Sequence, residues 1–177
     1  MKEYWKKAFK ELNNVRSLTG AAFLAALSPV LAMMSITVNQ YMQIGFTSLI
    51  HAMTGFLYGP IVAAMTGGIA DVIKYLIKPT GAFFPGFTLN EILVGFLYGV
   101  FFYGQKEIKL PRAVIVRLII TFLINLTLTP LWLSIMYGNA FKFMVPVRLI
   151  KNLVMIPVDV FLLYTVLNFV NKTLKKK

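Results

Sequence analysis

The chain alternates between long apolar segments and short polar ones. Four apolar segments are each long enough to cross a bilayer as a helix: residues 18–38, 87–104, 113–137 and 146–171. Residues 48–77 hold two shorter apolar segments, which Tyr58-Gly59-Pro60 separates as a tight turn. This pattern predicts an all-α integral membrane protein with six transmembrane helices in one bundle.

Amino-acid composition narrows the class of protein further. Hydrophobic residues make up 58% of the 177 residues, which is more than the core of a soluble domain of this length needs. The length fits one domain, so we treat residues 1–177 as a single transmembrane domain. The chain has no Cys and a single His, His51, which excludes disulfides, thiolate metal sites and His-rich metal centres. We expect neither a metal nor a cofactor.

The positive charge follows the membrane pattern. The net charge is +12, but Lys and Arg stand mostly at the ends of the apolar segments, which is typical of membrane topology and not of nucleic-acid binding. Most of these side chains, Arg117 included, fall on the cytoplasmic side if both termini are cytoplasmic. We therefore predict a multi-pass protein of the plasma membrane with both termini in the cytoplasm. Residues 1–20 lack the short apolar core of a signal peptide.

Both ends of the chain are basic. In residues 1–16, Trp5, Phe9 and Leu12 share one helical face, which predicts an amphipathic helix on the membrane surface. The alternative is a frayed basic tail. Residues 172–177 form a second basic tail.

Residues 35–47 are uncharged but polar, and they follow the first apolar segment. We expect a loop or a re-entrant segment that is shielded from lipid, because its backbone groups would otherwise lack hydrogen-bond partners. Its amide side chains, Asn39, Gln40 and Gln43, can hydrogen-bond the edge of a ring.

Six ionisable side chains within the predicted spans fall in the outer half of the membrane: His51, Asp71, Lys74, Glu91, Arg148 and Lys151. A charge in hydrocarbon costs roughly 2.5–3.5 kcal/mol, so such groups usually face a cavity or one another. We infer a polar cavity open to the outside. The alternative is a set of structural ion pairs, Asp71 with Lys74 and Glu91 with Arg148 or Lys151, or side chains that snorkel outward.

Aromatic and amide side chains stand beside these charges, in the stretch 71–91 and near the end of a later span. Phe83, Phe84 and Phe87 can hold a flat ring by stacking, and the alternative for them is packing against lipid. Trp132, near the end of a later span where amphipathic rings favour the interface, is also a candidate for substrate binding. Asn90 can contact the ring edge or cap the helix that starts there.

The charged residues would complete such a site. Asp71 or Glu91 can accept hydrogen bonds from an amino-substituted heterocycle, and Arg148 with Lys151 can hold a carboxylate.

Motifs for catalysis are missing from the sequence. It contains no G-x-x-x-x-G-K-[ST], no H-E-x-x-H and no G-x-S-x-G, so we expect no enzyme and no catalytic residue. The chain is also short for a transporter of inverted repeats, so the energy for uphill transport is expected from a partner.

Five stretches, in order over most of residues 20–160, resemble the substrate-binding S subunits of energy-coupling factor vitamin transporters, and among them the folate-specific subunits. They are GAAFLAAL, FLYGPIVAAMTGGIADVI, PTGAFFPGFTLNEILVGFLYG, LWLSIMYG and PVRLIKNLVMIP. The third is the most specific of the five.

The resemblance implies a six-helix protein that binds folate or a related pterin from outside. It further implies a complex with a transmembrane coupling subunit and two ATPases, which hydrolyse the ATP. Four alanines match the first-helix motif that packs on the coupling subunit in this family: Ala21, Ala22, Ala25 and Ala26. Residues 35–47 take the place of the family's lid loop. The alternatives are an S subunit for another vitamin or heterocyclic metabolite, and a membrane structural protein without a ligand.

Overall fold

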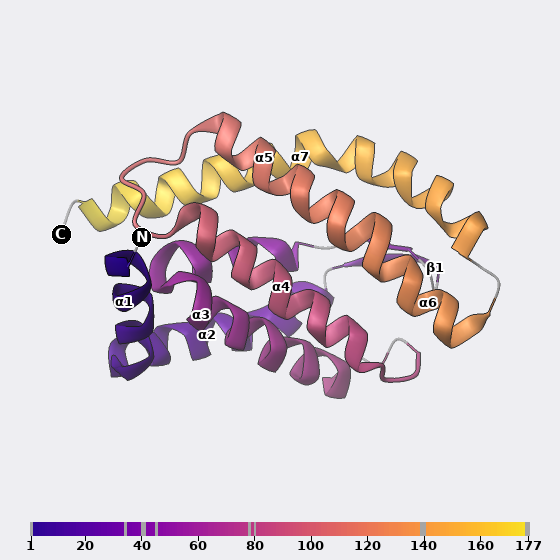
Figure 1. Cartoon of the computed structure of the whole chain (residues 1–177), viewed down its shortest axis with the longest axis horizontal. Helices are drawn as coiled ribbons and strands as arrows, with labels where there is room; N and C mark the ends of the chain where they lie inside the picture. Colours follow the sequence, from indigo (N-terminus) through magenta and orange to yellow (C-terminus); the bar gives the residue numbers. More distant parts are fainter. Residues whose placement is uncertain are drawn as a thin grey trace.

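The computed structural model describes residues 2–33, 35–39, 42–44, 46–77, 79, 81–138 and 141–175. Its elements, in chain order, are α1 (Lys2–Lys10), the 3₁₀ turn η1 (Glu11–Asn13), α2 (Val15–Met33), β1 (Ile36–Asn39), β2 (Met42–Ile44), α3 (Thr47–Ile77), α4 (Pro85–Phe102), α5 (Leu110–Ile120), the π-helix η2 (Thr121–Leu128), α6 (Thr129–Tyr137) and α7 (Phe141–Lys175). The helices form an elongated bundle with both termini at one end (Figure 1). The β1–β2 ribbon lies at the other end.

Five stretches of the described chain are long and apolar enough to cross a membrane: Val15–Met33, Thr47–Ile77, Pro85–Phe102, Leu110–Tyr137 and Lys151–Thr173. The second contains a break at Gly59, where φ is +86°, so it comprises two helices and the bundle has six. The predicted all-helical membrane architecture is confirmed, and so is the division of residues 48–77 at Tyr58-Gly59-Pro60.

The two halves of α3 fold back alongside each other at Gly59. His51 and Gly67 stand at equal distances along the chain on either side of that break, and both lie against Glu91 of α4. In a continuous helix these two residues would be about 24 Å apart. Gly59 permits the turn because its positive φ is costly for any residue with a side chain.

Close packing of α3 on α4 depends on glycine. A Cβ atom on Gly55 would stand only 2.6 Å from the backbone nitrogen of Gly99, so a side chain there would force the helices apart. This close approach brings the side chains of the two α3 halves within reach of α4.

The interior and exterior of the bundle are both apolar, as lipid requires. Tyr98, Phe102 and Leu163 are fully buried between the helices, whereas Leu153 is 70% exposed and Phe161 66% exposed. Exposed apolar side chains of this kind suit a surface that faces hydrocarbon.

The polar segment between α2 and α3 is a short antiparallel ribbon. Ile36 pairs with Ile44 and Thr37 with Gln43, with an irregularity before the Asn39–Met42 pair. Backbone pairing within the ribbon satisfies the groups that a bare loop would leave open. Asn39 and Gln43 lie on its two strands, and Gln40 lies outside the described residues.

The chain ends differ in part from expectation. Residues 2–10 are helical, so the alternative of a frayed tail is wrong for them. The first residues of the predicted basic tail at 172–177 belong to a helix, because α7 continues through Lys175.

Candidate functional site

An ionic network joins α3 to α4 in the half of the bundle away from the termini. The Nε2 atom of His51 lies 2.9 Å from Oε2 of Glu91, and Nζ of Lys74 lies 3.3 Å from Oε1 of the same carboxylate. Lys74 also lies 2.7 Å from Oδ1 of Asp71, one turn earlier on its helix. The hydroxyl of Thr88 donates to Oδ2 of Asp71 over 2.8 Å.

The carboxylate oxygens of the network all have partners within it. Each oxygen of Asp71 and Glu91 has a donor, and Lys74 stands between the two carboxylates. The predicted pair of Asp71 with Lys74 is present. Glu91 has Lys74 and His51 as its partners, where the sequence alternative named Arg148 or Lys151. Such pairing lowers the cost of holding four ionisable groups inside a bundle.

Asn90 ties α4 to α6. Its amide nitrogen donates to Oγ1 of Thr129 over 3.1 Å, and its amide oxygen accepts from Nε1 of Trp132 over 3.1 Å. The alternative that Asn90 caps a helix is wrong, because α4 begins at Pro85 after Phe84 at the N-cap position. Buried Asn90 therefore positions Trp132.

The aromatic side chains meet at the same end of α4. The ring of Phe84 lies 5.7 Å from that of Trp132 and 6.1 Å from that of Phe87, edge-on to the latter. Gly86 leaves the space they need, because a Cβ atom there would stand 2.7 Å from Cδ2 of Trp132. All three residues are partly buried, so part of each remains accessible from outside the bundle.

A second charged group joins α5 to α7. Arg117 and Asp159 form a buried ion pair, Nη2 to Oδ2. Lys151 interacts electrostatically with both and with Arg148. Three basic side chains, Arg117, Arg148 and Lys151, thus lie near one another in this group, together with the carboxylate of Asp159.

Arg117 is a buried member of the bundle and not a charge at its surface. It was predicted among the cytoplasmic charges, and in the structure it is 9% exposed and paired with Asp159. α5 begins at Leu110, so Arg117 lies two turns into the helix and not at its N-terminus.

The four alanines of α2 point in two directions. Ala21 and Ala25 are each 4% exposed and pack inside the chain. Ala22 and Ala26, also one turn apart, are exposed. Of the four predicted coupling residues, the first pair is not available to a partner in this structure, and the second pair is.

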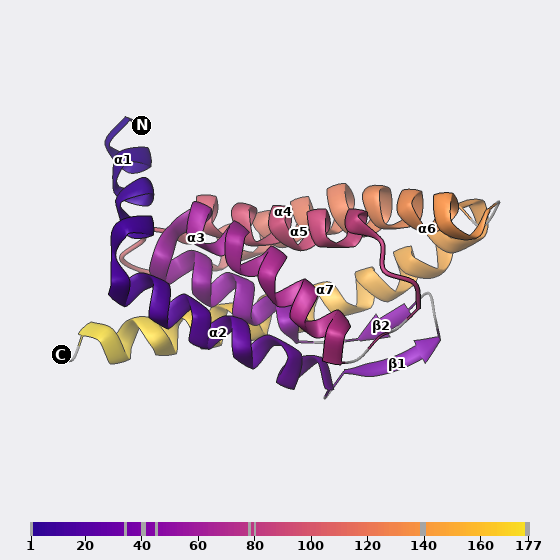
Figure 2. The same ribbon diagram turned by 90° about the horizontal axis from the view of Figure 1, so that it is seen from below.

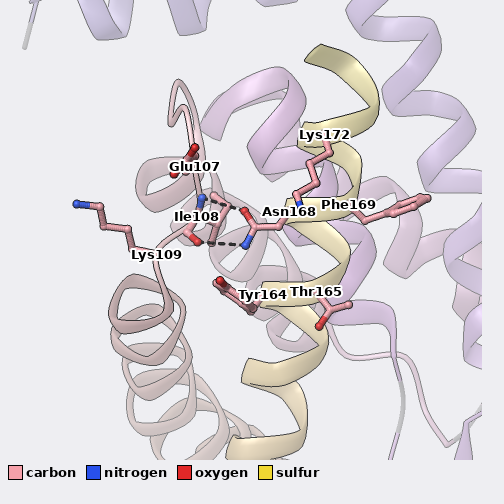
Figure 3. A pocket seen from close by; sticks show the side chains of 8 residues that line it. All are labelled: Glu107, Ile108, Lys109, Tyr164, Thr165, Asn168, Phe169 and Lys172. Atoms are coloured by element: carbon pink, nitrogen blue, oxygen red, sulfur yellow. Dashed lines mark hydrogen bonds between the residues drawn. The ribbon is translucent and has the colours of Figure 1, made fainter. Parts of the chain in front are cut away.

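A separate hollow of about 470 Å³ lies at the end of the bundle that carries the termini, between the α4–α5 loop and α7 (Figure 3). Asn168 holds the loop there, accepting from the backbone nitrogen of Ile108 and donating to its carbonyl oxygen. Lys109 and Lys172 stand at its sides. It contains none of the residues predicted for substrate binding.

The family comparison adds an independent finding. The model of the ECF transporter substrate-specific component matches residues 16–167. The chain belongs to this family. Its six-helix bundle is therefore that of a substrate-specific component, and this class of protein is a transporter subunit and not an enzyme.

Named relatives of this substrate-specific component share most of its length. The folate transporter FolT of Clostridium novyi (strain NT) is 35% identical over 153 residues, 86% of this chain and 88% of the relative. FolT of Leuconostoc mesenteroides is 29% identical over 170 residues, 92% and 91% of the two chains. A crystal structure of FolT bound with folic acid superposes with a TM-score of 0.80 at 35% identity, covering 88% of this chain and 96% of that one.

Sequence reasoning missed several side chains of this substrate-specific component. Thr88 and Thr129 complete the contacts of Asp71 and Asn90, but hydroxyls within apolar helices carry no signal of their partners. Arg117 and Asp159 did have a signal, since both are charged residues inside predicted spans.

Proposed function

We propose that this chain is the folate-capturing component of an energy-coupling factor transporter. The observation that carries the proposal is its likeness, over nearly the whole of both chains, to a FolT structure bound with folic acid. The folate transporters among its relatives point the same way.

The chemistry of the residues agrees with this ligand. Folate combines a flat, amino-substituted pterin, an aromatic linker and an anionic glutamate tail. Phe84, Phe87 and Trp132 offer faces for stacking, and the carboxylates of Asp71 and Glu91 can accept further hydrogen bonds. The basic side chains of Arg148 and Lys151, which lie close enough to interact electrostatically, suit the tail.

We assign the substrate site to residues contributed mainly by α3, α4, α6 and α7 near the β1–β2 ribbon: His51, Asp71, Lys74, Phe84, Phe87, Asn90, Glu91, Trp132, Arg148 and Lys151. Within it, His51 and Asn90 act by holding Glu91 and Trp132 in place. The ribbon, with Asn39, Gln40 and Gln43, covers the site as a lid.

The orientation and partners follow from the same assignment. Both termini lie in the cytoplasm, so the site opens to the outside, and most Lys and Arg side chains at helix ends are cytoplasmic. A coupling subunit docks on the exposed pair Ala22 and Ala26, and two ATPases supply the energy.

Calorimetric titration of the purified, detergent-solubilised chain with folate tests the proposal. The protein is first denatured and refolded to remove co-purified ligand, and its helicity is checked by circular dichroism. We expect tight one-to-one binding without any partner, and no heat with thiamine or riboflavin as control ligands. An intact refolded chain that binds a control vitamin but not folate would replace the assignment with another vitamin.

A further inference from the structure

The short N-terminal helix α1 is not accounted for by substrate capture. It runs across the end of the bundle rather than along it, as both views show (Figures 1 and 2). A helix that crosses the end of a transmembrane bundle lies along the plane of the membrane, at the level of the lipid headgroups.

Contacts with α4 fix which flank of α1 faces the lipid. The Tyr4 hydroxyl donates to the carbonyl oxygen of Gly99 over 3.0 Å, close to the end of α4. The ring of Trp5 stacks on that of Phe96, with 6.1 Å between centroids and planes 20° apart. Because Phe96 lies about one turn deeper in α4 than Gly99, the Trp5 flank of α1 points toward the membrane interior.

The same flank continues with an exposed aromatic residue. Phe9 follows Trp5 by one helical turn and is 58% exposed, whereas Ala8, on the side that packs against the bundle, is fully buried. A phenylalanine on the interior-facing flank of an interfacial helix reaches the acyl chains. Trp5 beside it has the amphipathic ring that is enriched at this depth.

Cationic side chains occupy the side of α1 away from the bundle. Lys6 and Lys10, one turn apart and both exposed, lie on the side opposite Ala8, and exposed Lys7 lies on the flank opposite Phe9. Lysines at this level extend their ammonium groups to the phosphates of neighbouring lipids. An anionic headgroup offers them more charge than a zwitterionic one.

Two tyrosines and a glutamate hold α1 in this position. The Tyr103 hydroxyl donates to Oε1 of Glu11 over 3.0 Å, and the hydroxyl of Ser17 donates to the other oxygen of the same carboxylate. The ring of Tyr4 meets that of Tyr103 edge-on at 5.7 Å. Burial and the Glu11 hydrogen bond raise the pKa of Tyr103 to about 12, so this hydroxyl stays a donor at physiological pH.

We propose that α1 is a docking helix for anionic phospholipid, with Trp5 and Phe9 seated in the acyl region and Lys6 and Lys10 on the headgroups. The helix is held against α4 by the contacts above, so lipid bound along α1 becomes part of the lipid shell around the substrate-specific component. This surface is independent of the folate site, which lies at the other end of the bundle.

The chain offers a clean fluorescence test, because it contains two tryptophans. Trp132→Phe leaves Trp5 as the sole reporter in the full-length protein, reconstituted in nanodiscs of equal amounts of phosphatidylcholine and phosphatidylglycerol. In one set of discs the phosphatidylcholine carries bromine on its acyl chains, and in a second set the phosphatidylglycerol does. We expect brominated phosphatidylglycerol to quench Trp5 more strongly.

Neutralising the helix lysines should remove that preference. Lys6→Gln with Lys10→Gln keeps side-chain length and helix propensity, and we expect a loss of up to about fivefold in preference per lysine. The matched control removes the same charge from the loop at the same end, with Lys106→Gln and Lys109→Gln, and should leave the preference in place. Equal quenching by both lipids before and after the α1 substitutions would overturn the proposal.

Depth measurements give a second readout that does not depend on charge. Because the chain has no cysteine, Phe9→Cys and Lys7→Cys each provide a unique site for a nitroxide label. We expect the label at position 9 to be reached by oxygen dissolved in lipid, and the label at position 7 by a water-soluble nickel complex. A water-exposed label at position 9 that becomes shielded only with the coupling subunit present would assign this flank to that partner and refute lipid docking.

Discussion

Nε2 of His51 lies 2.9 Å from Oε2 of Glu91, which places an imidazole from the first half of α3 on the carboxylate that also holds Lys74 from the second half. Glu91 therefore fastens three helices at one point. Glu91→Gln should lower the free energy of unfolding by about 1–3 kcal/mol, because the amide keeps the hydrogen bond to His51 but loses the charge facing Lys74. Thermal unfolding in detergent measures the change.

Exposed Glu3, at the other end of the bundle, provides the control for that substitution. Glu3→Gln removes the same charge and should leave the melting temperature nearly unchanged. Equal destabilisation by the two variants would show that net charge, and not the His51–Glu91–Lys74 contact, is responsible.

Substitutions of Asn90 and Trp132, which share a hydrogen bond, should have coupled effects on stability. Asn90→Ala leaves the indole N–H of Trp132 and the hydroxyl of Thr129 without this partner, and Trp132→Phe removes only the other end of one bond. A double-mutant cycle on unfolding should give an interaction energy of about 0.5–3 kcal/mol. Strict additivity would mean that the two side chains act independently.

The buried pair of Arg117 and Asp159 makes a sharper prediction. Asp159→Asn leaves Arg117 charged and without its carboxylate, and should destabilise the protein by about 3–5 kcal/mol. Replacing both residues by leucine should recover part of that loss, since the charge of Arg117 is then removed together with its carboxylate. Chemical denaturation of all three proteins measures it, and a double variant as unstable as Asp159→Asn would contradict the ion-pair account.

Arg148 should contribute to the anionic tail of folate and not to its pterin. Arg148→Ala is expected to weaken folate binding by about tenfold to a hundredfold, as for the loss of a charge-assisted hydrogen bond. Binding of pteroate, which lacks the glutamate, should change little. Calorimetry with both ligands decides the matter, and equal losses would refute the assignment of the tail.

Neighbouring alanines on α2 should respond differently to a bulky substituent. Ala22→Trp adds its ring to an exposed face, so folate binding should persist while uptake in cells with the coupling subunit and ATPases fails. Ala21→Trp forces a ring into a buried site and should impair folding itself. Normal uptake by Ala22→Trp would remove this face from the coupling surface.

Local patterns predicted the features that depend on a few consecutive residues. Segment length and hydropathy gave the spans, Tyr58-Gly59-Pro60 gave the break, and the three-residue spacing of Asp71 and Lys74 gave their contact. Partners from separate helices were not predictable in this way. Glu91 contacts both His51 and Lys74 because α3 and α4 pack closely. The glycines permit this close packing, but they do not determine which side chains meet across it.

Boundary placement caused the remaining differences. Starting the fifth span at residue 113 rather than at Leu110 put Arg117 near a membrane surface, and starting the fourth at 87 rather than at Pro85 made Asn90 resemble a cap. Errors of two or three residues are ordinary for helix ends read from sequence. The residues of the substrate site, and the lid on the ribbon, stay predictions until binding is measured.

The fold-back at Gly59 has a consequence for how the chain enters the bilayer. The first half of α3, residues 47–58, would extend only about 18 Å, too short to span a hydrocarbon core of about 30 Å by itself. It carries His51, whose stabilising carboxylate is made only later, on α4. We therefore expect the two halves of α3 to enter the membrane together as one hairpin, and to reach their final position once α4 packs against them.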